Sequence, residues 1–76
     1  MKAYVFITVA AGKSPDVVQQ LRRRSGVRSA NICWGLPDIV ALIEAADSKA
    51  LQELVVNEIQ RISGVQQTDT HLLFEQ

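Results

Sequence analysis

The sequence contains little cysteine and no excess of charge of either sign. Its only cysteine, Cys33, has no partner for an internal disulfide, which excludes a small secreted domain held by disulfides and fits the reducing cytoplasm. Eight Lys and Arg residues balance eight Asp and Glu residues, so net charge does not favour a nucleic acid or an anionic membrane as the main partner. No apolar run approaches the roughly 20 residues that span a bilayer. A cytoplasmic protein that does not act on membranes is expected.

The sequence also lacks the short motifs of common catalytic and cofactor sites. It contains no P-loop, no dinucleotide fingerprint and no nucleophile elbow, and one histidine with one cysteine cannot supply the ligands of a convincing metal site. We therefore predict no catalytic residue, no cofactor and no metal. His71 and Asp69 share one face of a predicted strand, where a carboxylate can orient an imidazole as a base. No nucleophile accompanies them, so the pair supports only an alternative hypothesis.

What the sequence does contain is an internal repeat. Residues 17–27, VVQQLRRRSGV, recur almost intact as residues 55–65, VVNEIQRISGV. Each copy is typical of an amphipathic helix, a Ser-Gly stop and a valine that opens a strand, and an apolar run precedes each copy at 4–11 and 39–46. The 76 residues suffice for one small domain, 1–76, and for no second core. The sequence therefore predicts a β-α-β unit written twice.

Capping signals predict where the two helices begin and end. Ser14 is expected to be the N-cap of the first helix, with Pro15 at the first helical position, and Gly26 suits the left-handed residue that closes it. The second helix is expected to begin near Asp47 or Ser48 and to run to about residue 63. Apolar residues should form the inner faces of the helices: Val17, Val18 and Leu21 in the first, and Leu51, Leu54, Val55, Ile59 and Ile62 in the second.

The polarity of the four predicted strands indicates their order in the sheet. Residues 4–10 and 39–46 are apolar on both faces, whereas 27–34 and 65–74 carry many polar side chains. The apolar strands are therefore expected at the centre and the polar strands at the edges. Right-handed crossovers then place both helices on one face of the sheet. The expected fold is an α+β, ferredoxin-like β-α-β-β-α-β sandwich with an antiparallel sheet of order 4-1-3-2.

Two helices can cover only one face of this sheet, and the other face is also apolar. In the first strand the two faces are formed by Val5, Ile7 and Val9 on one side and by Tyr4, Phe6 and Thr8 on the other. A large exposed apolar patch usually marks an interaction surface. We therefore predict a homodimer packed sheet to sheet, and a larger ring, with Tyr4, Phe6 and Trp34 at interfaces.

Further motifs resemble a known family. They are the S-G-V entry to the last strand, the G-x-x-D at Gly35 to Asp38 and the T-x-T at Thr68 to Thr70. Together with the order of strands and helices, they are similar to the effector-binding domain of the leucine-responsive regulatory protein/AsnC (Lrp/AsnC) family, also called the RAM domain. The resemblance spans the whole chain. Members join a helix-turn-helix to this domain, which forms dimeric α/β barrels, assembles dimers into rings and binds amino acids between subunits.

The resemblance implies a non-enzymatic module that senses an amino acid or a similar small zwitterion and changes its oligomeric state. The DNA-reading part is absent here, so the chain resembles the stand-alone version, direct DNA binding is not inherited, and output is expected through mixed assembly with full-length regulators. Carried over by position, Gly35 opens the backbone near a ligand, Asp38 supplies a carboxylate for an ammonium group, and Thr68 and Thr70 offer hydroxyls. Pro37 replaces the family's usual aromatic residue, which reshapes or removes the pocket.

Each of these residues also has a purely structural explanation, and other functions stay open. Gly35 fits any turn, Asp38 can bond its own backbone, and threonines suit an edge strand. One alternative is a small dimeric ferredoxin-like enzyme, of the monooxygenase or isomerase type, that uses His71 and Asp69 in a closed pocket. The other is a single-stranded RNA binder, which is disfavoured because residues 39–43 offer no aromatic platform.

Overall fold

The computed structural model describes residues 1–74 and contains the predicted β-α-β-β-α-β order. The second helix continues past its α-helical part through one π-helical turn, η1, and one 3-10 turn, η2. The bounds of the elements are β1 Lys2–Val9, α1 Ser14–Arg22, β2 Val27–Ile32, β3 Ile39–Glu44, α2 Ser48–Glu53, η1 Leu54–Glu58, η2 Ile59–Arg61 and β4 Val65–Leu72.

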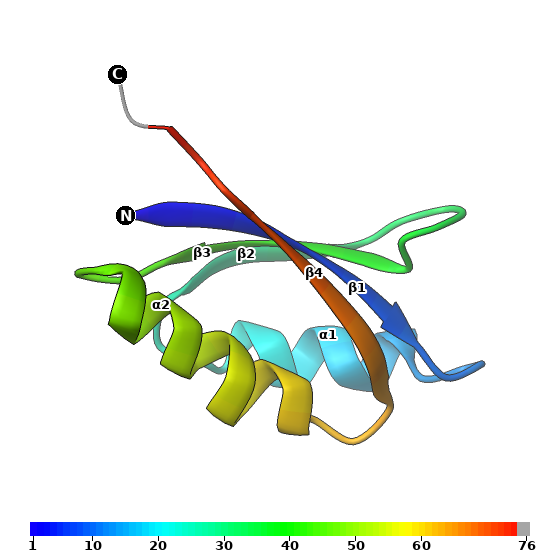
Figure 1. Ribbon diagram of the computed structural model, residues 1–76. Coiled ribbons are helices and arrows are strands. Elements are labelled where there is room, and N and C mark those ends of the chain that lie inside the picture. Colours follow the sequence, from blue (N-terminus) through cyan, green and yellow to red (C-terminus); the bar gives the residue numbers. More distant parts are fainter. Residues whose placement is uncertain (75–76) are drawn as a thin grey trace.

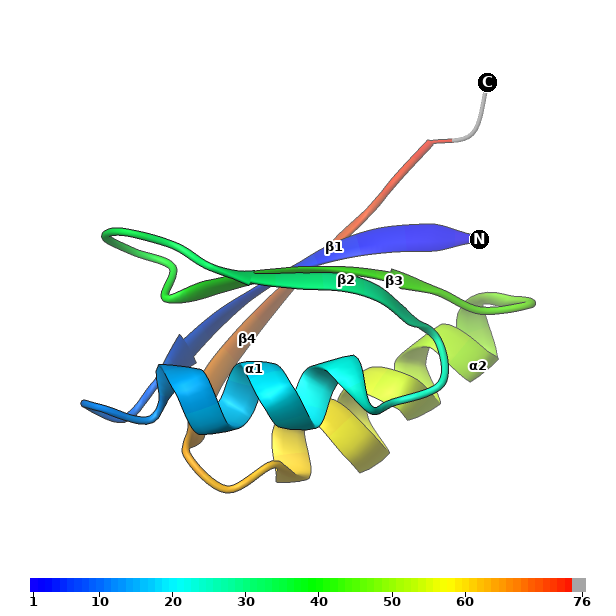
Figure 2. The same ribbon diagram turned by 180° about the vertical axis from the view of Figure 1, so that it is seen from behind.

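The sheet confirms the predicted topology. Its strand order is β2-β3-β1-β4, and the pairs β1–β3, β1–β4 and β2–β3 are all antiparallel. The two apolar strands, β1 and β3, therefore occupy the centre. Both helices lie against the same face of the sheet, and no helix or strand of residues 1–74 lies against the other face (Figures 1 and 2). The chain has the ferredoxin-like fold expected from its sequence.

The core lies between the helices and the covered face of the sheet. Alternate residues of the central strands point into it, because successive side chains of a strand point to opposite faces. Ala3, Val5 and Ile7 of β1 are completely buried. The inner faces of the helices are buried as predicted, and their members are Val17, Val18, Leu21, Leu51, Leu54, Val55, Ile59 and Ile62.

The repeat is visible in the turns that follow the two helices. Gly26 and Gly64 have φ angles of +95° and +100°, in the left-handed region that glycine adopts without a steric cost. In each copy the strand-opening valine donates a backbone hydrogen bond to the residue three positions earlier, at 3.2 Å for Val27 and 3.1 Å for Val65. The same sequence thus builds the same helix-to-strand turn twice.

The two helices begin in different ways, and the predicted cap of the first one is wrong. The residue at its N-cap is Lys13, and no side chain there caps the helix. The turn that begins at Ala10 brings Lys13 into a near-helical backbone conformation, so Ser14 is already the first helical residue. The second helix begins as predicted, since the Asp47 Oδ1 accepts a hydrogen bond from the backbone N–H of Ala50 at 2.8 Å.

Candidate functional site

The face of the sheet that the helices leave uncovered carries both apolar and polar side chains. Directly paired residues of neighbouring strands lie on the same face, so the register places Tyr4 and Phe6 beside Leu42 and Val40 of β3. Tyr4 is 41% exposed, and the other three are half-buried. We call this surface the open face. The register also places on it Lys2 and Thr8 of β1, Glu44 of β3, Ser29 and Asn31 of β2, and Gln67, Asp69 and His71 of β4.

Asp69 and His71 lie together on the open face, as predicted. The His71 Nε2 is 3.1 Å from the Asp69 Oδ2, and the His71 ring packs on Phe6 with 4.7 Å between the ring centroids. The two side chains are 51% and 65% exposed. Neither residue lines a cavity found in the described part of the chain. In a single chain the pair is therefore open to solvent.

Asp38 holds the end of β1 to the connection between β2 and β3. Its Oδ2 accepts a hydrogen bond from the backbone N–H of Val9 at 2.9 Å. Its backbone N–H donates to the carbonyl of Ile7 at 3.0 Å, and its carbonyl accepts from the N–H of Cys33 at 2.7 Å. The carboxylate therefore bonds a neighbouring strand rather than its own backbone. A ligand at this position would share the carboxylate with the Val9 amide.

Gly35 belongs to the connection between β2 and β3, and this connection extends past the sheet (Figure 1). Its φ angle is +108°, and a side chain built at this position would meet no other atom within 4 Å. The neighbours Trp34 and Leu36 are 106% and 85% exposed. We call Trp34–Leu36 the tip. It is a strongly exposed apolar feature, and Gly35 supplies the backbone conformation that the turn requires.

Thr68 and Thr70 point to the helix side of the sheet, away from the open face. Their β1 partners are Ile7 and Val5, which are completely buried in the core. The Thr68 Oγ1 accepts a hydrogen bond from the Gln60 Nε2 at 2.9 Å. The two threonines also lie in different cavities. The structure therefore does not bring Gly35, Asp38, Thr68 and Thr70 into one cavity of a single chain.

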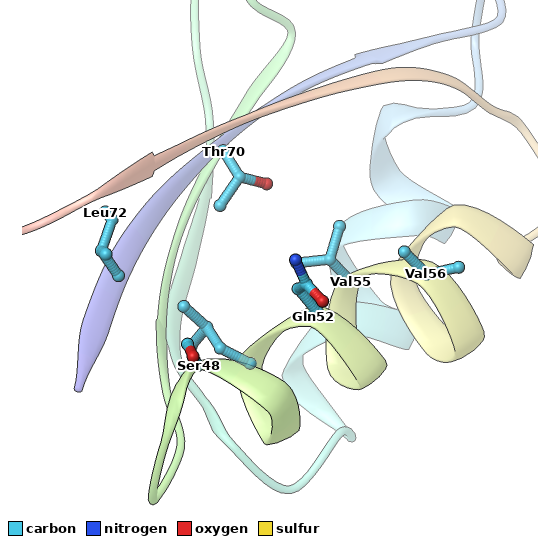
Figure 3. A pocket seen from close by; sticks show the side chains of 7 residues that line it. Ser48, Gln52, Val55, Val56, Thr70 and Leu72 are labelled. Carbon is cyan, nitrogen blue, oxygen red and sulfur yellow. The ribbon is translucent and has the colours of Figure 1, made fainter.

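A groove between α2 and β4 was not anticipated from the sequence. It has a cavity volume of about 340 Å³ and is lined by Ser48, Leu51, Gln52, Val55, Val56, Thr70 and Leu72. Figure 3 shows Thr70 and Leu72 of the strand opposite Gln52, Val55 and Val56 of the helix. A second opening further along β4, of about 380 Å³, is lined by Gln60, Val65, Gln66, Gln67 and Thr68.

Three arginines at or after the end of α1 make contacts within the chain. Arg22 donates two hydrogen bonds to the carbonyl oxygen of Ala30, at 2.8 and 3.1 Å. The Arg24 Nε lies 3.8 Å from the Glu58 Oε1. Arg28 forms a shorter ion pair with Glu44, at 2.7 Å. Arg22 and Arg24 lie at the C-terminal end of α1, where cations interact favourably with the helix dipole, and these contacts give them a structural role.

Residues 1–74 contain no group of three or more His, Cys, Asp or Glu side chains placed to hold a metal ion. Over the same range, no helix is both long and apolar enough to cross a bilayer.

Comparison with solved structures supports the fold assignment. The chain is 25% identical to a protein described as FFRP-DM1, with a TM-score of 0.92, and the match covers 96% of this chain and 97% of that one. It is 24% identical to AsnC of E. coli, with a TM-score of 0.91, over 99% of this chain and 51% of that one. A Neisseria meningitidis transcriptional regulator, NMB0573, solved as a complex with L-Met, is 17% identical with a TM-score of 0.85 over 97% of this chain and 49% of that one.

Comparison with curated proteins found no match. Residues 2–76 match the model of the family described as the Lrp/AsnC ligand binding domain. The match covers almost the whole sequence, and it agrees with the strand order and the paired Ser-Gly turns of the structure. The chain therefore belongs to the Lrp/AsnC ligand-binding domain family.

Proposed function

We propose that this chain is a non-enzymatic sensing and assembly module of the Lrp/AsnC type. It forms a homodimer through its open face and binds an amino acid or a similar small zwitterion between chains. The observation that carries this proposal is the open face itself, on which Tyr4, Phe6, Val40 and Leu42 lie uncovered by any helix. Burying apolar surface contributes about 25 cal/mol per Å². A patch of several hundred Å² therefore contributes on the order of several kcal/mol to dimerisation.

The ligand class follows from the candidate residues. A carboxylate such as that of Asp38 forms a charge-assisted hydrogen bond with an ammonium group, and the open backbone at Gly35 leaves room for a ligand to approach. Thr68 and Thr70 line different cavities, and Asp38 lines neither of them, so we propose that a site that uses all four residues combines two chains. The L-Met bound to the Neisseria relative supports an amino acid as the first ligand to test.

Binding between chains provides the signal. A ligand that binds only the assembled form stabilises that form by about 2.7 kcal/mol at a hundredfold excess over its dissociation constant. We propose that output passes through mixed assembly with full-length Lrp/AsnC regulators in the cytoplasm, and that those partners make the DNA contacts. The match to about half of E. coli AsnC supports such an exchange of equivalent domains.

Light scattering with and without a panel of free amino acids tests this function. We expect the wild-type chain to be at least dimeric and one amino acid at millimolar concentration to change its mass or its melting temperature. If no amino acid changes either quantity, the sensing proposal is wrong. If the wild-type chain is monomeric, with its open face exposed to solvent, the assembly proposal is wrong as well.

The variant Asp38→Asn sharpens the assignment of the ammonium partner. Asn keeps an oxygen that can accept the Val9 N–H hydrogen bond but removes the negative charge, so the fold should survive while the response to the amino acid is lost. Asp38→Ala removes both functions and serves as the comparison for stability. A full response by Asp38→Asn would exclude the carboxylate from ligand binding.

A further inference from the structure

Outside the open face, the exposed large apolar residues of the described part of the chain are Met1, Ile32, Trp34, Leu36, Val56, Leu72 and Phe74. Four of them form two local features. One is the tip, where Trp34 and Leu36 are 106% and 85% exposed. The other is the groove between α2 and β4, where Val56 and Leu72 are each 52% exposed. An aromatic side chain buries about 150–250 Å² when it enters an interface. A fully exposed tryptophan beside a fully exposed leucine is therefore an unusual surface for a chain that stays alone.

The groove exists because the second helix covers β4 incompletely. On the helix side of the sheet, Val5 and Ile7 of the central strand are completely buried, but Thr70 and Leu72 of β4 stay exposed. Val56 belongs to the π-helical turn, in which the N–H of Ile59 reaches back to the carbonyls of Leu54 and Val55. π-helical turns are rare and are frequent at functional sites.

The tip and the groove lie at opposite ends of the sheet. Ile39, the first residue of β3 after the tip, pairs with Ile7 near the end of β1. Leu72 in the groove pairs with Ala3 near the beginning of β1. Figures 1 and 2 show the same separation, with the loop between β2 and β3 at one end and the start of α2 at the other. The tip of one chain therefore cannot enter its own groove, but it can enter the groove of another chain.

The two surfaces are also chemically matched. The groove lining is apolar at Leu51, Val55, Val56 and Leu72 and carries neutral polar groups at Ser48, Gln52 and Thr70. Its volume of about 340 Å³ lies at the lower end of the range for pockets that enclose small organic groups, about 300–1,000 Å³. An indole ring needs an apolar pocket and an acceptor for its N–H, which the rim oxygens supply. No lining residue is charged, so insertion does not bury an ionised group.

We propose that Trp34 of one copy inserts into the α2–β4 groove of a second copy. This is a head-to-tail contact, which generates a ring or a filament rather than a closed pair. It rests on the proposed self-assembly, because one tip in one groove buries less than the about 1,200 Å² at which stable interfaces begin. A dimer formed through the open face presents two tips and two grooves, and paired contacts strengthen one another. The contact also brings Gly35 and Asp38 of one chain toward Thr70 of another.

Intrinsic fluorescence tests the fate of the tip directly, because Trp34 is the only tryptophan. In dilute solution its emission should be that of a solvent-exposed indole. The emission maximum should shift to shorter wavelength as assemblies larger than a dimer form. The shift should be absent in Val56→Lys, which places a charge in the groove. A Trp34 that stays solvent-exposed in the largest wild-type assembly would overturn the proposal.

Variants followed by light scattering test the head-to-tail geometry. Trp34→Ser and Val56→Lys should each reduce the mass of the assembly to that of a dimer. Asn57→Lys adds the same charge at the neighbouring exposed residue, which does not line the groove, and should assemble like the wild type. Mixing Trp34→Ser with Val56→Lys should restore masses above the dimer, because each chain supplies the surface that the other lacks.

The outcomes separate this contact from the proposed function. A wild-type chain that stops at a dimer, or a Val56→Lys variant that assembles fully, overturns the tip-in-groove contact and leaves the open-face dimer standing. Failure of the mixture to exceed a dimer also overturns it. A monomeric wild-type chain overturns both proposals. Far-ultraviolet circular dichroism of each variant checks that a reduced mass does not come from unfolding.

Discussion

The two copies of the repeat contain the same pair of valines in different surroundings. Val18 in the first helix is 5% exposed, whereas its counterpart Val56 in the second is 52% exposed. The preceding valines, Val17 and Val55, are buried in both copies. The difference shows that the repeat gives a helical segment in both copies, α-helical in the first and π-helical in the second, but not equal burial. Burial depends on what the rest of the chain places opposite each position.

The strands opposite the two helices explain part of this difference. Ala30 of β2 and Thr68 of β4 occupy equivalent positions in the two copies. Ala30 is 2% exposed, and its carbonyl accepts the two hydrogen bonds from Arg22. Thr68 is only half-buried, and it accepts one hydrogen bond from Gln60, the counterpart of Arg22. In the first copy the helix therefore buries the strand residue Ala30 and bonds to it through Arg22. In the second copy the equivalent strand residue, Thr68, stays partly exposed.

The largest expected effect comes from substituting the left-handed glycines that the two copies share. Gly26→Ala forces a side chain into the left-handed region, 3.0 Å from the Leu54 Cδ2 and 3.1 Å from the backbone oxygen of Glu44, and should cost about 3 kcal/mol. Gly64→Ala meets the Cβ of Lys13 at 3.0 Å and no backbone atom among its three nearest contacts; because Lys13 is exposed just before α1 and can shift, this variant should cost less. Urea unfolding of both variants at one protein concentration measures the difference. Equal costs would show that backbone strain, not contact, dominates.

The next effect tests the valine pair. Val18→Ala removes two buried methyl groups and should lower the free energy of unfolding by about 2 kcal/mol. Val56→Ala should lower it by less than about 0.5 kcal/mol, because surface truncations usually have small effects. The comparison needs a concentration at which the groove is unoccupied, and equal losses there would contradict the difference in burial.

A smaller effect tests the side-chain hydrogen bonds that join each helical segment to the strand that follows it. Arg22→Ala leaves the carbonyl of Ala30 without its two hydrogen bonds and should cost about 1.5 kcal/mol, since hydrogen bonds to charged groups are stronger than neutral ones. Gln60→Ala removes one exposed neutral hydrogen bond and should cost about 0.5 kcal/mol. Thermal unfolding at matched concentration gives both values. A larger loss for Gln60→Ala would mean that β4 depends on this contact more than its exposure indicates.

The smallest effect concerns the two helix starts. Asp47→Ala removes the side-chain acceptor of the Ala50 N–H and should cost about 1 kcal/mol, the usual value of an N-cap. Ser14→Ala should be nearly neutral, because Ser14 is the first helical residue and Lys13 occupies the cap position. Denaturant midpoints of the two variants provide the measurement. A substantial loss for Ser14→Ala would restore it as a cap.

Much of the fold could be predicted because it depends on local patterns. The Ser-Gly-Val turns, the helix faces and the apolar strands each extend over a few residues, and the difference between apolar and polar strands set the sheet order correctly. The prediction that Ser14 is the N-cap failed because of the turn from Ala10 to Lys13. This turn already gives Lys13 a near-helical backbone, so the N-cap position lies at Lys13, one residue earlier. A serine followed by proline cannot reveal that shift.

The candidate site was harder to predict because its geometry depends on contacts between distant segments. The pairing of Asp69 with His71 was correctly expected from their spacing on one strand. The hydrogen bond between Asp38 and Val9 joins residues 29 positions apart, and no motif indicates it. The assignment of Gly35, Asp38, Thr68 and Thr70 to ligand binding stays a prediction. The groove could have been suspected only from Val56, an apolar residue next to the buried Val55.

The sequence by itself determined the repeat, the two central strands and an apolar second face, because side-chain periodicity and glycine conformation act over neighbouring residues. Only the tertiary structure decided which of two equivalent valines is buried, where the Asp38 carboxylate is bound, and that the tip and the groove lie at opposite ends of the sheet. These features arise from strand register and from one π-helical turn. Both are set by the packing of the whole chain rather than by the residues on either side.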